Sequence, residues 1–137
     1  MRVILDTNIL LSALMTRGTP PDRLYEEWRH GRFDLVSTGR QIEELREVVR
    51  RPFFQVRLKA SEIGRMVNDI RRLAVMCETL PAVQRSPDPA DDYLLALCEA
   101  SLADYLVTGD KCHLLGLDRH HGTRIVSARC LVDLLDR

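Results

Sequence analysis

Residues 2–14 have the sequence RVILDTNILLSAL, and this stretch decides how the chain begins to fold. Residues 3–5 form a continuous aliphatic run, which is typical of a strand buried on both faces. Asp6 follows directly, and a second apolar run over residues 8–15 predicts a helix. The carboxylate between these two segments has two interpretations. It caps the helix by accepting from backbone N–H groups, or it belongs to a functional site at the carboxyl end of a strand.

The composition is that of an ordinary globular protein. The 137 residues are 45% hydrophobic and 29% charged, so we expect residues 1–137 to form a single domain. No run of about 18 apolar residues predicts a membrane span, and the N-terminus lacks the pattern of a signal peptide. We therefore expect a cytoplasmic protein with no membrane association. The four cysteines form no C-x-x-C pair, and we interpret each as a small buried apolar residue.

The net charge is zero, with 20 basic and 20 acidic residues, but the two signs are distributed unevenly. Residues 40–72 contain nine basic and five acidic side chains, whereas residues 73–137 contain six basic and ten acidic ones. Arginines on solvated helix faces explain the basic segment without any function. The same segment also fits a rim that binds phosphates beside an acidic site, and charge alone leaves both interpretations open.

The hydrophobic pattern predicts strands and helices in alternation. Strands are expected at residues 2–5, 33–36, 105–107 and 124–126, and helices at residues 8–15, 22–30, 40–51, 61–73, 91–102 and 128–135. Thr38 and Gln41 resemble a capping box at the start of the third helix, and Pro52 is expected to end that helix. Segment 81–92 contains three prolines and is expected to form a loop. Strands separated by helices indicate an α/β fold with a parallel sheet covered on both faces.

Acidic residues follow two of the expected strands. Asp6 comes after the first strand and Asp110 comes soon after strand 105–107, and ligands of open parallel sheets bind beyond such carboxyl ends. Asp91 and Asp92 begin the helix after the proline-rich loop, and Glu44 lies within helix 40–51. Each acid alone is explained as a helix cap, a partner of the helix dipole or a solvated side chain.

Taken together, these acids indicate a bound cation. Two carboxylates about 4 Å apart repel each other by about 4 kcal/mol at an effective dielectric constant near 20, so several at one crevice need a cation or raised pKa values. Oxygen ligands suit Mg²⁺ or Mn²⁺, and no histidine accompanies the acids, which argues against zinc among them. A metal ion that is held by carboxylates and keeps bound water is equipped to hydrolyse a phosphodiester.

Four segments carry a resemblance over essentially the whole chain: VILDTNILLSAL (3–14), QIEELREVV (41–49), DPADDYLLALCEASLADYLVTGDKCHLL (88–115) and RIVSARCLVDLL (124–135). Together they resemble a PIN-domain nuclease, in particular the VapC-like toxin components of type II toxin–antitoxin systems. The resemblance implies a three-layer α/β/α fold around a central parallel β-sheet of about four to five strands. It also implies a ribonuclease that cleaves single-stranded or structured RNA with Mg²⁺ or Mn²⁺ held by a cluster of acids.

Carried over residue by residue, the resemblance implies the roles of individual side chains. The catalytic and metal-binding acids are Asp6, Glu44, Asp92 and Asp110, and the supporting residues are Asn8, Asp91 and Thr108. Glu44 matches the family pattern better than its neighbour Glu43 does. Cys112 stands where many relatives carry a further Asp, which puts a fifth carboxylate in doubt.

The resemblance also implies a mechanism and partners. A metal-activated water attacks the phosphate in line and leaves a 3′-hydroxyl and a 5′-phosphate, while Glu44 or Asp92 orients or deprotonates that water. Asp6 is then first a metal ligand and only secondarily a helix cap. The implied partners are an RNA substrate, a second copy of the chain in a homodimer, and a small antitoxin that inserts an arginine-bearing segment into the acidic crevice.

Three alternatives stay open at this point. A catalytically silent RNA- or protein-binding module would have the same fold, because fold does not guarantee activity. A haloacid-dehalogenase-type phosphatase also has an Asp after its first strand, but its chemistry needs a second acid two residues later, where this chain has Asn8. A zinc site at Cys112, His113, His120 and His121 would have suitable ligand types in an unusual spacing of adjacent pairs.

Overall fold

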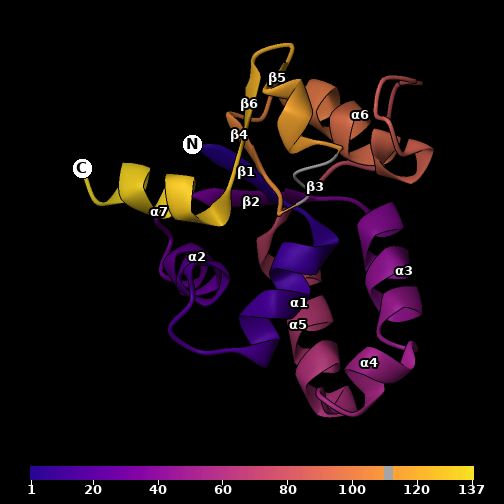
Figure 1. Cartoon of the computed structure of the whole chain (residues 1–137), viewed down its shortest axis with the longest axis vertical. Coiled ribbons are helices and arrows are strands. Elements are labelled where there is room, and N and C mark those ends of the chain that lie inside the picture. Colours follow the sequence, from indigo (N-terminus) through magenta and orange to yellow (C-terminus); the bar gives the residue numbers. More distant parts are fainter. Residues whose placement is uncertain (110–112) are drawn as a thin grey trace.

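The computed structural model describes residues 1–109 and 113–137, and Figure 1 shows the course of the chain. The strands are β1 (Arg2–Leu5), β2 (Asp34–Ser37), β3 (Val75–Met76), β4 (Tyr105–Val107), β5 (Arg119–His120) and β6 (Thr123–Val126). The α-helices are α1 (Thr7–Met15), α2 (Pro20–Arg29), α3 (Gly39–Val48), α4 (Pro52–Gln55), α5 (Ala60–Leu73), α6 (Asp92–Ser101) and α7 (Ala128–Leu135). Two short 3-10 helices are η1 (Pro89–Asp91) and η2 (Leu115–Leu117).

The strands form one six-stranded sheet in the order β3-β2-β1-β4-β6-β5. β1 pairs in parallel with β2 and β4, and β3 and β6 extend the parallel part on either side. β5 pairs with β6 in the antiparallel direction, because a tight turn joins them. The α/β class and the expected parallel sheet of four to five strands are confirmed, because five of the six strands run parallel and β5 adds an antiparallel edge. The two strands that the hydrophobic pattern did not predict are β3 and β5. β3 and β5 have two residues each, so they are too short to show a hydrophobic period.

Side chains of the strands alternate between two hydrophobic cores. On one face, aliphatic side chains of the strands pack with helices α1, α2, α3, α5 and α7; these strand residues are Val3, Leu5, Leu35, Val107 and Val126. On the other face, the intervening residues Ile4, Val36, Leu106 and Ile125 pack with α6. Figure 1 shows α6 and the larger group of helices on opposite sides of the sheet. The predicted three-layer α/β/α arrangement is therefore confirmed.

Prolines explain two helix boundaries that differ from the prediction. α2 begins at Pro20 rather than at residue 22, because the Thr19 side chain accepts from the backbone N–H of Asp22 and proline is favoured in the first turn. α3 ends at Val48, and Pro52 starts the short helix α4 instead of ending α3. The loop predicted for residues 81–92 is confirmed for residues 81–88, whereas residues 89–91 form the 3-10 helix η1 and α6 begins at Asp92.

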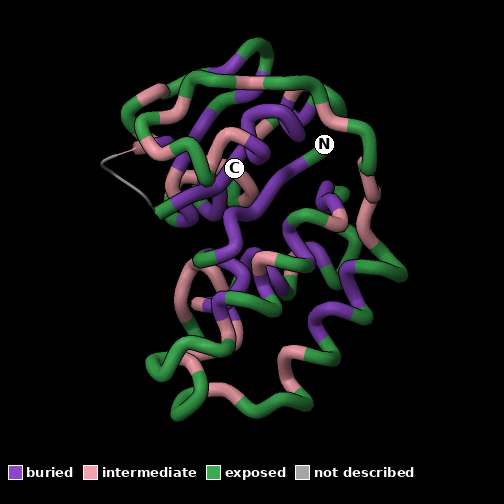
Figure 2. The backbone as a smooth tube through the Cα atoms, turned by 90° about the vertical axis from the view of Figure 1, so that its right-hand side faces the viewer, coloured by how far each residue is buried: buried purple, intermediate pink, exposed green. Residues whose placement is uncertain are grey.

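Burial follows the sheet and the helices beside it. Figure 2 shows the buried part of the chain in the middle of the molecule, whereas residues 50–65, which link α3 to the start of α5, are exposed or half-buried. Within the described ranges, none of the helices has both the length and the apolar character needed to cross a bilayer.

The topology brings three elements to one edge of the sheet. α1 and α3 begin directly after the carboxyl ends of the neighbouring parallel strands β1 and β2. α6 precedes β4 and packs against the sheet, so its first turn lies toward the same edge. Of the predicted acids within the described residues, Asp6 precedes α1, Asp91 and Asp92 stand at the start of α6, and Glu44 lies within α3.

Candidate active site

Asp6 lies where β1 turns into α1, and it is buried. Its backbone N–H donates to the carbonyl of Val107 on β4 over 2.9 Å, which ties the residue to the neighbouring strand. Although Asp6 occupies the N-cap position of α1, its side chain makes no capping hydrogen bond. The secondary role of Asp6 as a side-chain cap is therefore wrong, and the carboxylate is presented at the edge of the sheet instead.

Thr108 holds the Asp6 carboxylate from the adjacent strand. Its hydroxyl Oγ1 donates to Asp6 Oδ2 over 2.8 Å, and both side chains are buried. The backbone N–H of Thr108 donates to the carbonyl of Val126 over 3.0 Å, so that the residue is fixed between β4 and β6. The structure thus brings Thr108 to Asp6. Asp110, together with Lys111 and Cys112, lies outside the described residues, so the roles predicted for Asp110 and Cys112 stay predictions.

Glu44 is held in place by a tyrosine that the sequence analysis did not single out. The hydroxyl of Tyr93, on α6, donates to Glu44 Oε1 over 2.8 Å and lies 3.3 Å from Thr7 Oγ1. Glu44 is half-buried whereas its neighbour Glu43 is exposed, which agrees with the choice of Glu44. Side chains from α1, α3 and α6 therefore meet at one hydroxyl group.

Tyr93 stays protonated because its surroundings oppose the phenolate. Burial raises the pKa of Tyr93 far above its ordinary value of 10.0, and the charge of Glu44 and, less strongly, that of Asp6 raise it further. Tyr93 therefore keeps its proton and remains a hydrogen-bond donor to Glu44. Thr7 follows Asp6 directly, so the Tyr93 hydroxyl lies between the beginning of α1 and Glu44.

Gln41 fixes the direction of α3. Its Nε2 donates to the carbonyl of Leu5 over 2.7 Å, and its Oε1 accepts from Ser37 Oγ over 2.6 Å, both in buried surroundings. The capping box predicted from Thr38 and Gln41 is wrong, because Thr38 makes no side-chain cap and Gln41 is used for this tertiary contact. Glu44 comes one helical turn after Gln41, so this contact also positions Glu44.

Asp92 is turned toward the proline-rich segment that precedes α6. Its Oδ1 accepts from the backbone N–H groups of Arg85 and Ser86 over 3.1 and 2.7 Å. Both bonds use Oδ1, so they fix the carboxylate without involving Oδ2. Asp91 is half-buried, stands at the N-cap of α6 and makes no side-chain capping bond.

A shallow hollow lies on the outside of this region. Asn8, Ile9, Ser12 and Gly109 line it, and its volume is about 340 Å³. Asn8 is exposed and lies one residue after Thr7 on the first turn of α1. The hydroxyl of Thr108 contacts the Asp6 carboxylate, and the supporting role of Asn8 stays a prediction.

The described acids do not yet form a tight ligand cage. Within residues 1–109 and 113–137, no three of the predicted carboxylates bring ligand atoms within 4.8 Å of one another. The donor set nevertheless consists of carboxylate and hydroxyl oxygens, which are the ligands that Mg²⁺ and Mn²⁺ prefer.

Fold and site together define an α/β protein whose buried carboxylate and hydroxyl groups gather at the carboxyl ends of parallel strands. The family model of the PIN domain matches residues 2–112, and the chain belongs to the PIN-domain family. This membership indicates a metal-dependent nuclease. No curated protein matches the chain at a significant level of similarity.

Sequence reasoning missed Tyr93 and the true role of Gln41. The available signal for Tyr93 was its place directly after Asp92, on the first turn of a helix that otherwise continues with aliphatic side chains. Gln41 offered no comparable signal, because its partner Leu5 is 36 residues away in the sequence.

Proposed function

We propose that this PIN-domain protein is an Mg²⁺- or Mn²⁺-dependent endoribonuclease and the toxin component of a type II toxin–antitoxin system. One observation carries the proposal. The buried Asp6 carboxylate is held by Thr108 at the adjoining ends of β1 and β4, and the next residue, Thr7, lies 3.3 Å from the Tyr93 hydroxyl that donates to Glu44.

The residues of the site fit a hard divalent cation. Asp6, Glu44 and Asp92 would supply carboxylate oxygens, and Asp110 is proposed as a fourth ligand from outside the described residues. When bound, such an ion lowers the pKa of a water molecule and neutralises charge on the phosphate.

The side chains of the site have separate roles in positioning the acids and in accepting a proton. Thr108 orients the Asp6 carboxylate, and Tyr93 occupies Glu44 Oε1, which leaves Glu44 Oε2 as the atom that accepts the proton of the attacking water. Asp92 is oriented by two backbone N–H groups, so it presents Oδ2 to the site at little entropic cost. Asp91 is proposed as an assisting acid.

An exposed arginine supports RNA as the substrate. The guanidinium of Arg40 lies over the ring of Tyr93, 5.4 Å from its centre, on the helix that carries Glu44. A cation beside an acidic centre is suited to hold a phosphate of the RNA backbone next to the carboxylates. The other proposed partners are an antitoxin that places an arginine among these carboxylates and a second copy of the chain in a homodimer.

The test is cleavage of labelled transfer and messenger RNA by the parent protein and by Asp6→Asn, with Mn²⁺, with Mg²⁺ and with a chelator. We expect cleavage only with metal, and a rate more than about 100-fold lower for Asp6→Asn, because a ligand and its charge are lost. Asp34→Asn is the matched control, since this exposed acid lies at the opposite end of β2.

Two results would contradict the proposal. Full activity of Asp6→Asn at saturating Mn²⁺ would remove Asp6 from the site. A parent protein that binds RNA without cleaving it, and that binds no Mn²⁺ in calorimetry, would be the silent binding module, which is the second candidate.

A further inference from the structure

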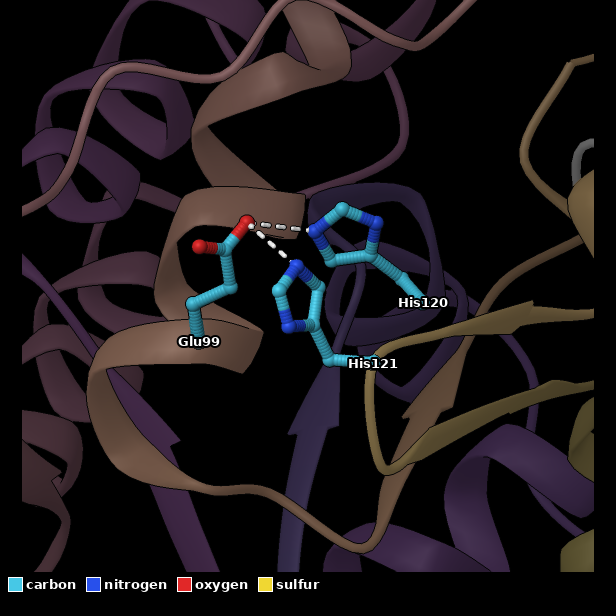
Figure 3. A group of neighbouring side chains, drawn as sticks. All are labelled: Glu99, His120 and His121. Atoms are coloured by element: carbon cyan, nitrogen blue, oxygen red, sulfur yellow. Dashed lines mark hydrogen bonds and ion pairs between the residues drawn. The ribbon is translucent and has the colours of Figure 1, made fainter.

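A second group of ligand-type side chains lies near the other end of α6. Glu99 Oε2 is 2.6 Å from His120 Nε2 and 3.5 Å from His121 Nε2, and Figure 3 shows both imidazole rings turned toward the carboxylate. Ligand atoms of these three residues all lie within 4.8 Å of one another, and no other group of this kind occurs among the described residues. The proposed nuclease site uses none of the three.

The hairpin β5–β6 brings the two histidines to Glu99. His120 pairs with Thr123, so the turn between the strands consists of His121 and Gly122 alone. His121 has a φ of 52°, in the left-handed region where histidine is one of the better tolerated residues but glycine costs less. His121 therefore occupies a turn position that favours glycine, and its Nε2 lies near the Glu99 carboxylate.

The cluster is closed on one side and open on the other. The side chain of His120 is 5% exposed and that of Glu99 is 25% exposed, whereas that of His121 is 67% exposed. A hollow of about 300 Å³ adjoins Glu99, His121 and Gly122 and leaves room for water ligands. Two imidazoles and a carboxylate with an open position are a known ligand set for Zn²⁺.

We propose that Glu99, His120 and His121 bind a late first-row divalent metal ion, with Zn²⁺ as the representative. Ligand atoms at tetrahedral positions about 2.1 Å from zinc lie about 3.4 Å apart, so the spacing of His121 and Glu99 already fits. The closer contact of His120 and Glu99 has to open by less than about 1 Å. The ion would join the C-terminal half of α6 to the β5–β6 hairpin.

The hydrogen bonds of His120 show which ring nitrogen carries the proton, and zinc binding requires this proton to move to the other nitrogen. Arg85 Nη1 lies 2.8 Å from His120 Nδ1, and because arginine only donates, Nδ1 accepts and Nε2 carries the proton that faces Glu99. Zn²⁺ replaces this proton at Nε2, and the proton moves to Nδ1. Arg85 then no longer donates to Nδ1 of His120. Its Nη1 keeps the hydrogen bond to the carbonyl of Arg119, which is 2.8 Å long.

This site is distinct from the acidic site. Glu99 lies seven residues after Asp92 on the same helix, which separates their backbones by about 10 Å along the axis. The ligand chemistry also differs, because imidazole favours zinc whereas the carboxylates favour magnesium or manganese. The inference therefore does not depend on the proposed nuclease activity.

The test is a calorimetric titration of the parent protein with Zn²⁺ in the presence of excess Mg²⁺, which keeps the carboxylate site occupied. We expect about one equivalent of Zn²⁺ to bind, and binding at least about 10-fold weaker in Glu99→Gln and in His121→Asn, since each loses one ligand. Asparagine is chosen because it tolerates the left-handed turn conformation, and glutamine because it still accepts from His120. Zinc should also raise the thermal midpoint of the parent protein more than that of either variant.

His30→Asn is the matched control, because it removes an exposed histidine at the end of α2 and should leave zinc binding unchanged. Thermal unfolding without metal shows whether each variant is folded before it is titrated. A parent protein that binds no Zn²⁺ would overturn the proposal. Undiminished binding in both variants would also overturn it, because the metal would then be held elsewhere, for instance by the cysteine thiols.

Discussion

Individual side chains at the acidic edge work in pairs that connect different elements. Thr108 holds Asp6, and Tyr93 holds Glu44 while it also contacts Thr7. A carboxylate that is fixed by a donor loses little freedom when it binds a cation or accepts a proton. The hydroxyl groups of Thr108 and Tyr93 therefore contribute to the site by fixing the orientation of the two carboxylates.

Replacing Tyr93 with phenylalanine tests this positioning. We expect kcat for RNA cleavage to fall about 10- to 100-fold with little change in KM, because the ring under Arg40 remains while the donor to Glu44 is lost. Steady-state kinetics with a labelled RNA measures the effect, and Tyr105→Phe on β4 is the control. Parental kcat in Tyr93→Phe would show that Glu44 needs no orientation by this hydroxyl.

Helices α3 and α6 give the site its shape. α3 is anchored to the last carbonyl of β1 through Gln41, and α6 is anchored at its start through the bonds of Asp92 to segment 81–88. Since α6 also carries Glu99, it connects the acidic edge with the histidine cluster. The position of the candidate site thus depends on a few polar contacts between elements, of which those of Gln41 are buried.

Gln41→Leu removes the anchor of α3 without creating a large cavity. We expect the free energy of unfolding to fall by about 2 to 4 kcal/mol, because the Leu5 carbonyl and the Ser37 hydroxyl lose buried partners. Urea unfolding with an unchanged m-value measures the loss. Gln55→Leu is the control, since Gln55 also donates to a carbonyl but is exposed, and its effect should stay below about 0.5 kcal/mol. Equal losses in both variants would contradict the anchoring role.

The molecule as a whole buries several weakly acidic groups in their neutral form. Burial raises the pKa of Tyr25 and Tyr93 far above their ordinary value of 10.0 and raises that of the Cys98 thiol from 9.0 to about 12. These groups belong to the two cores on opposite faces of the sheet. The folded chain therefore keeps protons at alkaline pH that the unfolded chain releases.

Stability should consequently fall at alkaline pH. The stabilisation from these groups is complete below about pH 9 and is lost as the pH rises toward their values in the folded state, by up to about 1.4 kcal/mol per pH unit for each group. Denaturant unfolding from about pH 8 to about pH 11 measures the slope. Tyr93→Phe should show a shallower slope, because one group no longer titrates, and a slope equal to that of the parent would contradict this account.

The sequence by itself determined the main elements and the family resemblance. The periods of its apolar residues predict the four longer strands and most helices, because such periods reflect which face of a local element is buried. The motifs around Asp6, Glu44 and Asp92 resemble the PIN-domain family, which the match over residues 2–112 confirms.

Only the tertiary structure decided which side chains meet. Two-residue strands such as β3 exist through pairing alone, and Tyr93 finds Glu44 across 49 sequence positions. His120 likewise meets Glu99 across 21 positions, through the closing of a hairpin against a helix. Local sequence patterns determine whether a segment forms a helix or a strand. Contacts between side chains depend instead on how distant segments pack against each other, and this packing involves residues of both hydrophobic cores.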